Sequence, residues 1–336
     1  MKGCPTSKTP KKMGHSPSTI QGFQFRDYDP SHLREVINGA DLEHTILEPK
    51  TCSADVWQWR SEGVSIDSGF YNFPVFVRGR FAKGQLCLGI SRGRQEPTWI
   101  NGYHLDRGSL QVYAEGAEML YRAGPSTDWV GITVSRELLQ NSALKHFGSE
   151  LTLPASGMRN CSIPPASVDL LMQLVRQSRE PQVTLKIDPQ WHQSQILRAC
   201  VEALMSGELD EAEKIKMRRR YRTDIFRRAD AVIRSLIDAG SGYSSPRICR
   251  ALGLSERNLQ LHFKDSLGMS PKMWFRQLAL ARVRSELIRQ TPKPGFVAEV
   301  AMKYGFDHLG RFSQDYRKIF GELPSTTLRR APVLTS

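Results

Sequence analysis

Residues 244–264 read SSPRICRALGLSERNLQLHFK, and residues 296–320 read FVAEVAMKYGFDHLGRFSQDYRKIF. Each stretch holds a short run with apolar residues at helical spacing, then a glycine, then a longer run with a second apolar stripe. Gly253 and Gly305 permit the positive φ that a tight turn between two helices requires. The repeated pattern predicts two helix-turn-helix units, each with a short helix packed against a longer one whose other face is open to solvent.

Serines mark where the helices of the first unit begin. We expect Ser245 to cap its short helix, with Pro246 in the first turn, where the missing N–H group costs nothing. Ser255 is expected to cap the longer helix. The apolar residues expected between the two helices are Ile248, Ala251, Leu252, Leu259 and Phe263.

The second unit repeats this design after a connecting segment. Its expected buried residues are Val297, Val300, Ala301, Phe306, Leu309, Phe312, Tyr316 and Phe320. Between the units, apolar residues at helical spacing predict one long helix over Met273–Gln290, which Pro292 and Pro294 terminate. Neighbouring major grooves on one side of DNA recur at about 34 Å, so a rigid connector would let one chain place both longer helices on the same side of a duplex.

Basic charge is concentrated in the last third of the chain. The formal net charge is +13; residues 1–210 hold 22 basic and 22 acidic side chains, and residues 211–336 hold 25 and 12. Lysine and arginine neutralise phosphates and release condensed counterions, so this asymmetry indicates a neutral domain joined to one that meets a polyanion.

The stretch from about Phe226 to Arg330 resembles the DNA-binding domain of the AraC/XylS family of bacterial transcription regulators. The motifs that carry the resemblance are ALGLSERNLQLHFKDSLGMSP at 251–271, ALARVRSELI at 279–288 and EVAMKYGFDHLGRFSQDYRKIFGELPS at 299–325. In that family the two recognition helices enter successive major grooves, which implies Ser255–Asp265 and Leu309–Ile319 here.

The resemblance also implies individual DNA contacts. The base-reading positions fall on Glu256, Arg257, Gln260, Leu309, Gly310, Arg311 and Gln314. The phosphate-contacting positions fall on Ser255, Lys264, Ser313, Arg317 and Lys318. Arginine pairs with guanine and glutamine with adenine in the major groove. The sequence departs from the family pattern at Leu309 and Gly310, where polar residues are usual, and at Ala279, where arginine is common.

The first two thirds of the chain predict a different kind of domain. From about Phe23 to Ser135, short alternating apolar runs are separated by turn residues, which is typical of an antiparallel sandwich or barrel. After Ser135 the apolar residues recur at helical spacing. This layout is similar to the cupin-like sensor and dimerisation domains that precede the same DNA-binding module. We therefore predict an α+β protein of two domains, a β-rich cupin-like barrel with flanking helices and an all-α domain with two helix-turn-helix units joined by a long helix.

Four segments follow from these patterns. We expect a disordered tail at 1–19, which has too little apolar content to repay its ordering entropy, and a sensor and dimerisation domain at 20–207. A charged linker is expected at 208–222 and the DNA-binding domain at 223–330.

Two groups of apolar residues in the first domain are candidate binding surfaces. A pocket for a small-molecule effector is expected among the aromatic residues, although aromatic residues in a small barrel are more often core. The pocket candidates are Trp57, Trp59, Tyr71, Phe73, Phe76, Trp99, Tyr103 and Tyr113. A helical stripe is either a homodimer seam or packs on the sandwich. The stripe consists of Ile196, Leu197, Cys200, Val201 and Leu204.

The sequence offers no motif for catalysis or cofactor binding. The six cysteines form no CxxC pair, His104 is the only histidine between Trp57 and Val134, and no phosphate-binding glycine loop is present. We expect no enzyme activity, metal or cofactor, and no membrane insertion or export, hence a cytoplasmic protein. The predicted function is sequence-specific transcription regulation with promoter DNA, RNA polymerase, a second copy of the chain and an effector as partners. The alternatives are a barrel oxygenase or isomerase tethered to nucleic acid, and a non-specific architectural DNA-binding protein.

Overall fold

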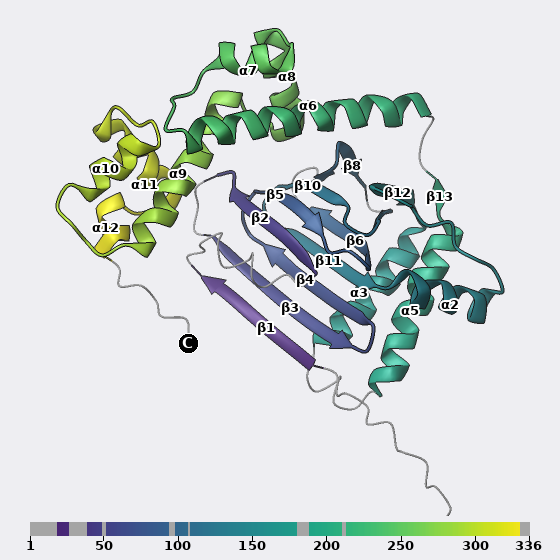
Figure 1. Cartoon of the computed structure of the whole chain (residues 1–336). Helices are drawn as coiled ribbons and strands as arrows, with labels where there is room; N and C mark the ends of the chain where they lie inside the picture. Colours follow the sequence, from purple (N-terminus) through teal and green to yellow (C-terminus); the bar gives the residue numbers. More distant parts are fainter. Residues whose placement is uncertain are drawn as a thin grey trace, which may run out of the picture.

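The computed structural model describes residues 19–26, 39–48, 52–93, 98–106, 108–179, 188–209 and 213–329. Residues 1–18 of the predicted tail lie outside these ranges, and Thr19 begins the first strand. We call residues 19–209 the β domain and residues 213–329 the helical domain (Figure 1). Strands dominate the first and helices make up the second, which confirms the predicted α+β class with two domains.

The β domain contains two antiparallel sheets. The first sheet consists, in spatial order, of β1 (Thr19–Arg26), β3 (Ser53–Ser61), β4 (Val64–Tyr71), β11 (Thr127–Val134), β6 (Leu86–Gly93), β9 (Ser109–Tyr113), β12 (Met158–Ser162) and β13 (Glu208–Leu209). The second sheet consists of β2 (Ala40–Ile46), β5 (Val75–Phe81), β10 (Glu118–Ala123), β7 (Thr98–Ile100) and β8 (Tyr103–Leu105). Side chains alternate between the two faces of each strand, so each sheet has one face toward the other sheet and one face outward.

Among the described residues, three helices cover the outer face of the first sheet. They are α2 (Arg136–Phe147), α3 (Pro165–Arg179) and α5 (Pro189–Ser206). One buried cluster joins residues of this sheet, such as Ile66 and Leu88, to residues of α3 and α5, such as Leu171 and Val201. The first sheet is therefore buttressed along its outer face by a packed layer of helices.

The helical stripe proposed as a dimer seam lies inside this layer. Ile196, Leu197, Cys200 and Val201 are buried, and Leu204 packs against the same cluster. The stripe packs on the first sheet of its own chain, which is the alternative that the sequence left open. Its use as a dimer seam is corrected, because a side chain already enclosed by its own sheet presents no area to a second copy.

The helical domain begins with a long helix and continues with shorter ones. Its helices are α6 (Glu213–Asp238), α7 (Ser245–Leu252), α8 (Glu256–Leu267), α9 (Pro271–Arg289), α10 (Phe296–Lys303), α11 (Leu309–Phe320) and α12 (Pro324–Arg329). Residues 213–222 of the predicted linker form the start of α6. The predicted connector over Met273–Gln290 is α9, which starts two residues earlier because Ser270 caps it and Pro271 opens its first turn.

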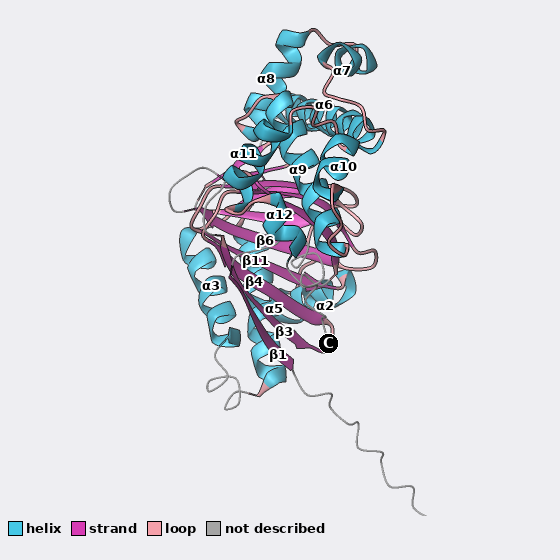
Figure 2. Cartoon of the chain, turned by 90° about the vertical axis from the view of Figure 1, so that its left-hand side faces the viewer, coloured by secondary structure: helices cyan, strands magenta, loops and turns pink. Residues whose placement is uncertain are grey.

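The two domains pack through the outer face of the second sheet. The core of the helical domain includes Leu47 and Phe76, which belong to the β domain, beside Phe226 and Trp274 of α6 and α9. Figures 1 and 2 show the helical domain on one side of the strands and α3 and α5 on the other. The order of layers is thus flanking helices, first sheet, second sheet and helical domain.

Candidate nucleic-acid interface

The first helix-turn-helix unit consists of α7 and α8. Gly253 between them has φ 66°, in the left-handed region that a glycine adopts without strain, and its N–H group donates to the carbonyl of Cys249. Ser255 caps α8, because its side chain accepts a hydrogen bond from the backbone N–H of Asn258 at 3.3 Å. Leu259 and Phe263 are fully buried against the rest of the unit, as predicted from their spacing.

Two details of this unit differ from the sequence-based expectation. The cap of α7 is Ser244, whose side chain accepts from the N–H of Arg247, and Ser245 is the first residue inside the helix. With two serines in a row, the identity of the cap depends on which one leaves helical φ and ψ, and Ser244 does so at φ −136°. Ala251 is exposed, so the buried side of α7 is narrower than expected.

All the proposed contacts of α8 lie on its solvent side. Ser255, Glu256, Arg257, Gln260 and Lys264 are exposed. By helical spacing, Arg257, Gln260 and Lys264 lie away from Leu259 and Phe263, which hold the helix to the domain, while Ser255 and Glu256 are exposed at the start of the helix. The helix therefore presents side chains that can reach base edges and phosphates, from a backbone fixed by its buried face.

The second unit has the same construction from α10 and α11. Gly305 turns the chain at φ 81°, and the N–H of Phe306 donates to the carbonyl of Ala301 at 3.0 Å. Phe312 and Tyr316 are buried, and the Tyr316 hydroxyl donates to Oγ1 of Thr327 in α12 at 2.9 Å. The stripe of α11 thus faces inward as predicted, apart from Leu309 at its first turn.

The proposed contacts of α11 lie mostly in solvent. The exposed ones are Leu309, Gly310, Arg311, Gln314, Arg317 and Lys318, while Ser313 is half-buried. A Cβ built on Gly310 would meet nothing within 4 Å, so the backbone of the first turn is open to close approach. The residue that opens α11, His308, makes no side-chain cap, which leaves the first N–H groups free to donate to an incoming anion.

The connector α9 holds the second unit through ion pairs. Arg284 donates from Nη1 to Oε1 of Glu322 at 3.0 Å, and both side chains are largely buried. Arg276 pairs with Asp315 of α11. These ion pairs fix the second unit to α9, and both units share one apolar core with that helix.

Arg276 is a functional candidate that the sequence did not reveal. Burial lowers its pKa, and the neighbouring charge of Arg311 lowers it further. Two guanidinium groups are thus close together beside α11, balanced within the chain by Asp315. Such a cluster favours an anion, and it places a second arginine next to a proposed base-reading position.

Of the aromatic residues predicted to line a pocket in the β domain, the structure places only some at a cavity. Tyr71 and Tyr113 line a cavity of about 80 Å³ between the two sheets. Trp57 and Trp59 lie on the outer face of the first sheet, where Arg179 stands over Trp57 and His192 meets the edge of Trp59. The remaining candidates lie outside the cavity. Phe73 is in the core, Trp99 is on β7, Tyr103 is on the edge strand β8, and Phe76 is between the domains. Alternation along each strand sends neighbouring aromatic residues to opposite faces, and composition alone does not say which face is the cavity.

Polar atoms without partners point to a binding role for this cavity. In the described part of the chain, Oε1 of Gln111, the Tyr113 hydroxyl and Nε1 of Trp129 are buried without a hydrogen bond. All three residues line the cavity. A buried polar group without a partner costs free energy, so these atoms form a site for a molecule that carries donors and acceptors.

The buried His44 makes the stability of the fold sensitive to pH. Burial lowers the pKa of His44 from 6.5 to about 4, so the folded protein holds it neutral while an unfolded chain takes up a proton below pH 6.5. Relative to a fully protonated group, neutral His44 therefore contributes about 3 kcal/mol to the free energy of unfolding above pH 6.5. This contribution is lost as the pH falls from 6.5 to about 4. Denaturant unfolding of the wild-type chain and His44→Gln should show the difference between them shrinking or reversing over this range, and a constant difference would contradict the assignment.

The described residues show neither a metal centre nor a membrane-spanning helix. In the described parts of the chain, no three His, Cys, Asp or Glu side chains gather in a way that could hold a metal ion. Within the same ranges, no helix is both long enough and apolar enough to cross a bilayer.

Two helix-turn-helix units on one rigid connector, each with an exposed polar recognition face, define a double helix-turn-helix DNA-binding protein. Comparison with known proteins agrees. Residues 248–330 match a family described as "Helix-turn-helix domain". The chain is 33% identical over 281 residues to the "probable thc operon regulatory protein" of Rhodococcus erythropolis, covering 79% of this chain and 77% of that protein.

Other similarities cover a smaller part of the chain. Over 87 residues the chain is 40% identical to "XylDLEGF operon transcriptional activator 1" of Pseudomonas putida, which is 26% of each protein. A solved structure, that of a "probable AraC family transcriptional regulator from Rhodopseudomonas palustris CGA009", is 30% identical over 32% of this chain and 97% of that one, with a TM-score of 0.30. The chain belongs to the AraC/XylS family of transcription regulators, and it is a DNA-binding transcription regulator of that type.

Proposed function

We propose that the chain binds promoter DNA by placing α8 and α11 in successive major grooves and acts on transcription through RNA polymerase. The observation that carries the proposal is the pair of exposed polar faces held by one connector, α9. Arg257 on α8 and Arg311 on α11 are the proposed guanine readers, and Gln260 and Gln314 the adenine readers. Lys264, Arg317 and Lys318 supply phosphate contacts, so binding weakens steeply with salt.

We further propose that the β domain senses a small molecule and carries the homodimer contact. The unpaired atoms of the cavity support the first part. Exposed Leu170, Trp191 and Met205 on the outer helices α3 and α5 support the second, because they are apolar side chains on a face that no other described element covers. The relative from Rhodococcus erythropolis is named an operon regulatory protein, and on this proposal the present chain likewise controls an operon in the cytoplasm without catalysing a reaction.

Recovery of genomic DNA fragments bound by the purified full-length chain tests the function. The expected result is a shared motif with two half-sites about one helical turn apart, with specific binding in the nanomolar range. A salt titration should give a linear fall of log affinity with log salt concentration for both specific and random fragments. Equal recovery of all fragments would instead favour the architectural alternative, which the exposed Glu256 argues against, because a carboxylate facing DNA opposes binding that depends on phosphates alone.

A further inference from the structure

The β domain completes the core of the helical domain. The ring of Phe76, on β5, lies 5.5 Å from that of Phe226 on α6 and 5.1 Å from that of Trp274 on α9, edge to face in both cases. Trp274 and Phe226 are fully buried in this arrangement. Separation of the domains would expose both rings, so the contact belongs to the folded core as much as to a domain interface.

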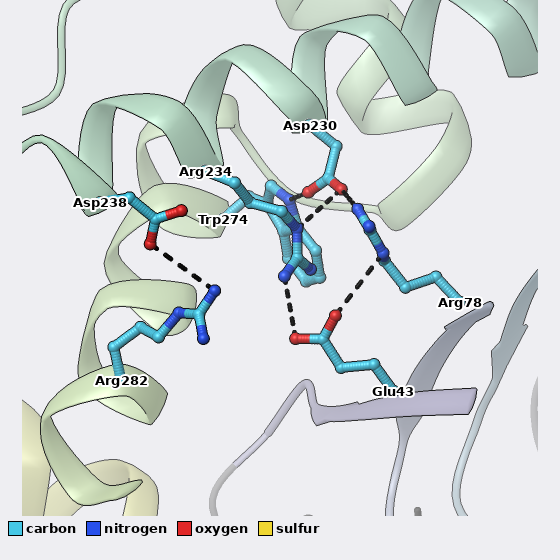
Figure 3. A network of polar contacts seen from close by, with 7 residues as sticks. All are labelled: Glu43, Arg78, Asp230, Arg234, Asp238, Trp274 and Arg282. Atoms are coloured by element: carbon cyan, nitrogen blue, oxygen red, sulfur yellow. Dashed lines mark hydrogen bonds and ion pairs between the residues drawn. The ribbon is translucent and has the colours of Figure 1, made fainter. Parts of the chain in front are cut away.

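A network of charged side chains meets this aromatic contact at Trp274 (Figure 3). Asp230 on α6 accepts hydrogen bonds from Nε1 of Trp274 at 2.7 Å and from Nε of Arg234 at 2.9 Å, and it pairs with Arg78 on β5. Glu43 on β2 accepts from Nη1 of Arg234 at 2.8 Å and lies 3.5 Å from Nε of Arg78. The Asp230 side chain is only 2% exposed, so its charge depends on these partners from both domains.

Three strands of the second sheet supply the β-domain side of the contact. On β10, Glu118 pairs with Arg227 of α6, and Arg122 lies against Gly268 at the end of α8, where a Cβ would be 2.7 Å from its Nη2. Nε2 of Gln277 on α9 donates to the carbonyl of Leu47 at 2.6 Å. We call the β-domain residues of this contact the clamp; they are Glu43, Leu47, Phe76, Arg78, Glu118 and Arg122.

The same strands line the cavity with their other face. The cavity residues on these strands are Leu42, His44, Val77, Phe81, Met119 and Tyr121. They alternate with clamp residues: Glu43 lies between Leu42 and His44, and Val77 lies between Phe76 and Arg78. Because neighbouring side chains of a strand are fixed to one backbone, a displacement that makes room in the cavity also moves the clamp.

The first sheet is poorly able to absorb such a displacement. Its outer face is packed against α2, α3 and α5 in a continuous buried cluster. The second sheet is covered on its outer face by the helical domain, through the clamp. Packed cores transmit strain, so an outward shift of the second sheet moves the side chains that hold the helical domain.

We propose that β2, β5 and β10 are a relay: a small molecule with at least one donor and one acceptor group, bound in the cavity, displaces the clamp and changes how the helical domain is held. The proposal rests on the proposed function of the β domain as a sensor. The ligand class follows from the unpaired atoms, because Trp129 and Tyr113 offer donors and Oε1 of Gln111 an acceptor. The cavity of about 80 Å³ limits the bound molecule to a small one.

Substitutions that place a larger side chain in the cavity test whether filling it displaces the clamp. Gly131 on β11 lines the cavity, and a Cβ there would lie 3.6 Å from Sγ of Cys87, which is ordinary contact. Gly131→Phe adds a rigid ring to the space, Gly131→Leu adds a smaller group, and Gly131→Ala is the matched control that fits without displacement. All variants are made in the full-length chain, and far-UV circular dichroism and thermal unfolding establish that each is folded.

Fluorine NMR of the chain labelled with 5-fluorotryptophan measures the environment of one tryptophan at the cavity and one at the clamp. Trp129 reports on the cavity and Trp274 on the clamp, and Trp129→Phe and Trp274→Phe assign their resonances among the six tryptophans. Phe76→Ala gives the resonance of Trp274 when the clamp is loosened. Affinity for a selected promoter fragment is measured on the same samples.

The relay predicts that Gly131→Phe and Gly131→Leu shift both resonances, Trp274 in the direction seen with Phe76→Ala, while Gly131→Ala leaves Trp274 in place. Affinity for the promoter fragment should change several-fold, in the same direction as for Phe76→Ala. A shifted Trp129 with an unmoved Trp274 in folded Gly131→Leu would overturn the relay and leave DNA recognition intact. Absence of specific binding by the wild-type chain would overturn the proposed function, and the Trp274 resonance would still decide the mechanical link.

Discussion

Replacing Arg257 by alanine is expected to weaken binding to the selected promoter sites by about 10- to 100-fold. The side chain is exposed near the start of α8, whose backbone is fixed by the Ser255 cap and the buried Leu259 and Phe263. A bidentate arginine–guanine pair contributes about 1–3 kcal/mol to discrimination, which corresponds to this range. Binding to random DNA should change little, because the loss concerns one base pair.

Arg311→Ala is expected to have an effect of the same size at the other half-site. Arg311 lies at the first turn of α11 beside Arg276, and Asp315 balances the second guanidinium. Its removal should relax the preference for one base pair in the second half-site and leave the first half-site unchanged. Repeating the recovery of genomic fragments with each variant measures which position of the motif loses information.

Lys264→Ala is the matched control for these two variants. Lys264 is exposed on the same face of α8 but is assigned to a phosphate. Its loss should lower affinity for all sequences alike and reduce the slope of log affinity against log salt concentration by about one. If Arg257→Ala behaved in the same way as Lys264→Ala, the assignment of Arg257 to a base edge would be wrong.

The helical domain was largely predictable because its signals are local. Caps, turn glycines and stripes such as Leu259 with Phe263, or Phe312 with Tyr316, act within one or two helical turns. The errors there were also local, such as the choice of Ser245 over Ser244 as a cap. The family resemblance added the expected contact positions, all of which lie on the solvent side except the half-buried Ser313.

The β domain was predictable as a class but not in its details. Alternation in strands indicates two faces, yet whether Trp59 faces the cavity or the flanking helices depends on how the sheets stack. The cavity atoms of His44, Gln111 and Trp129 come from three strands, β2, β9 and β11, of two sheets. No local pattern in the sequence joins them, and the same holds for Arg78 and Asp230, which are 152 residues apart.

Asp230→Ala is expected to be among the most destabilising single changes in the chain. The substitution removes one of the two carboxylates that pair with the buried Arg234, the one that is itself buried, and it removes the acceptor of the Trp274 indole N–H. Breaking a buried ion pair by removal of one partner costs about 3–5 kcal/mol, because the other charge stays out of water. Denaturant unfolding followed by far-UV circular dichroism, which reports mainly on the helices, measures the loss.

Glu43→Ala shows how much of the expected loss in stability comes from burial of the carboxylate and how much from its charge alone. Glu43 pairs with the same Arg234 and Arg78, but its side chain is 41% exposed, so water replaces it at little cost and the expected loss is about 0–1 kcal/mol. Asp230→Asn should fall between the two, because the amide oxygen still accepts from Trp274 while the negative charge is gone. Equal losses for Asp230→Ala and Glu43→Ala would mean that the contact acts as a surface ion pair. The predicted order would instead place the energetic centre of the domain contact on Asp230, the one carboxylate that binds α6, α9 and the β domain at once.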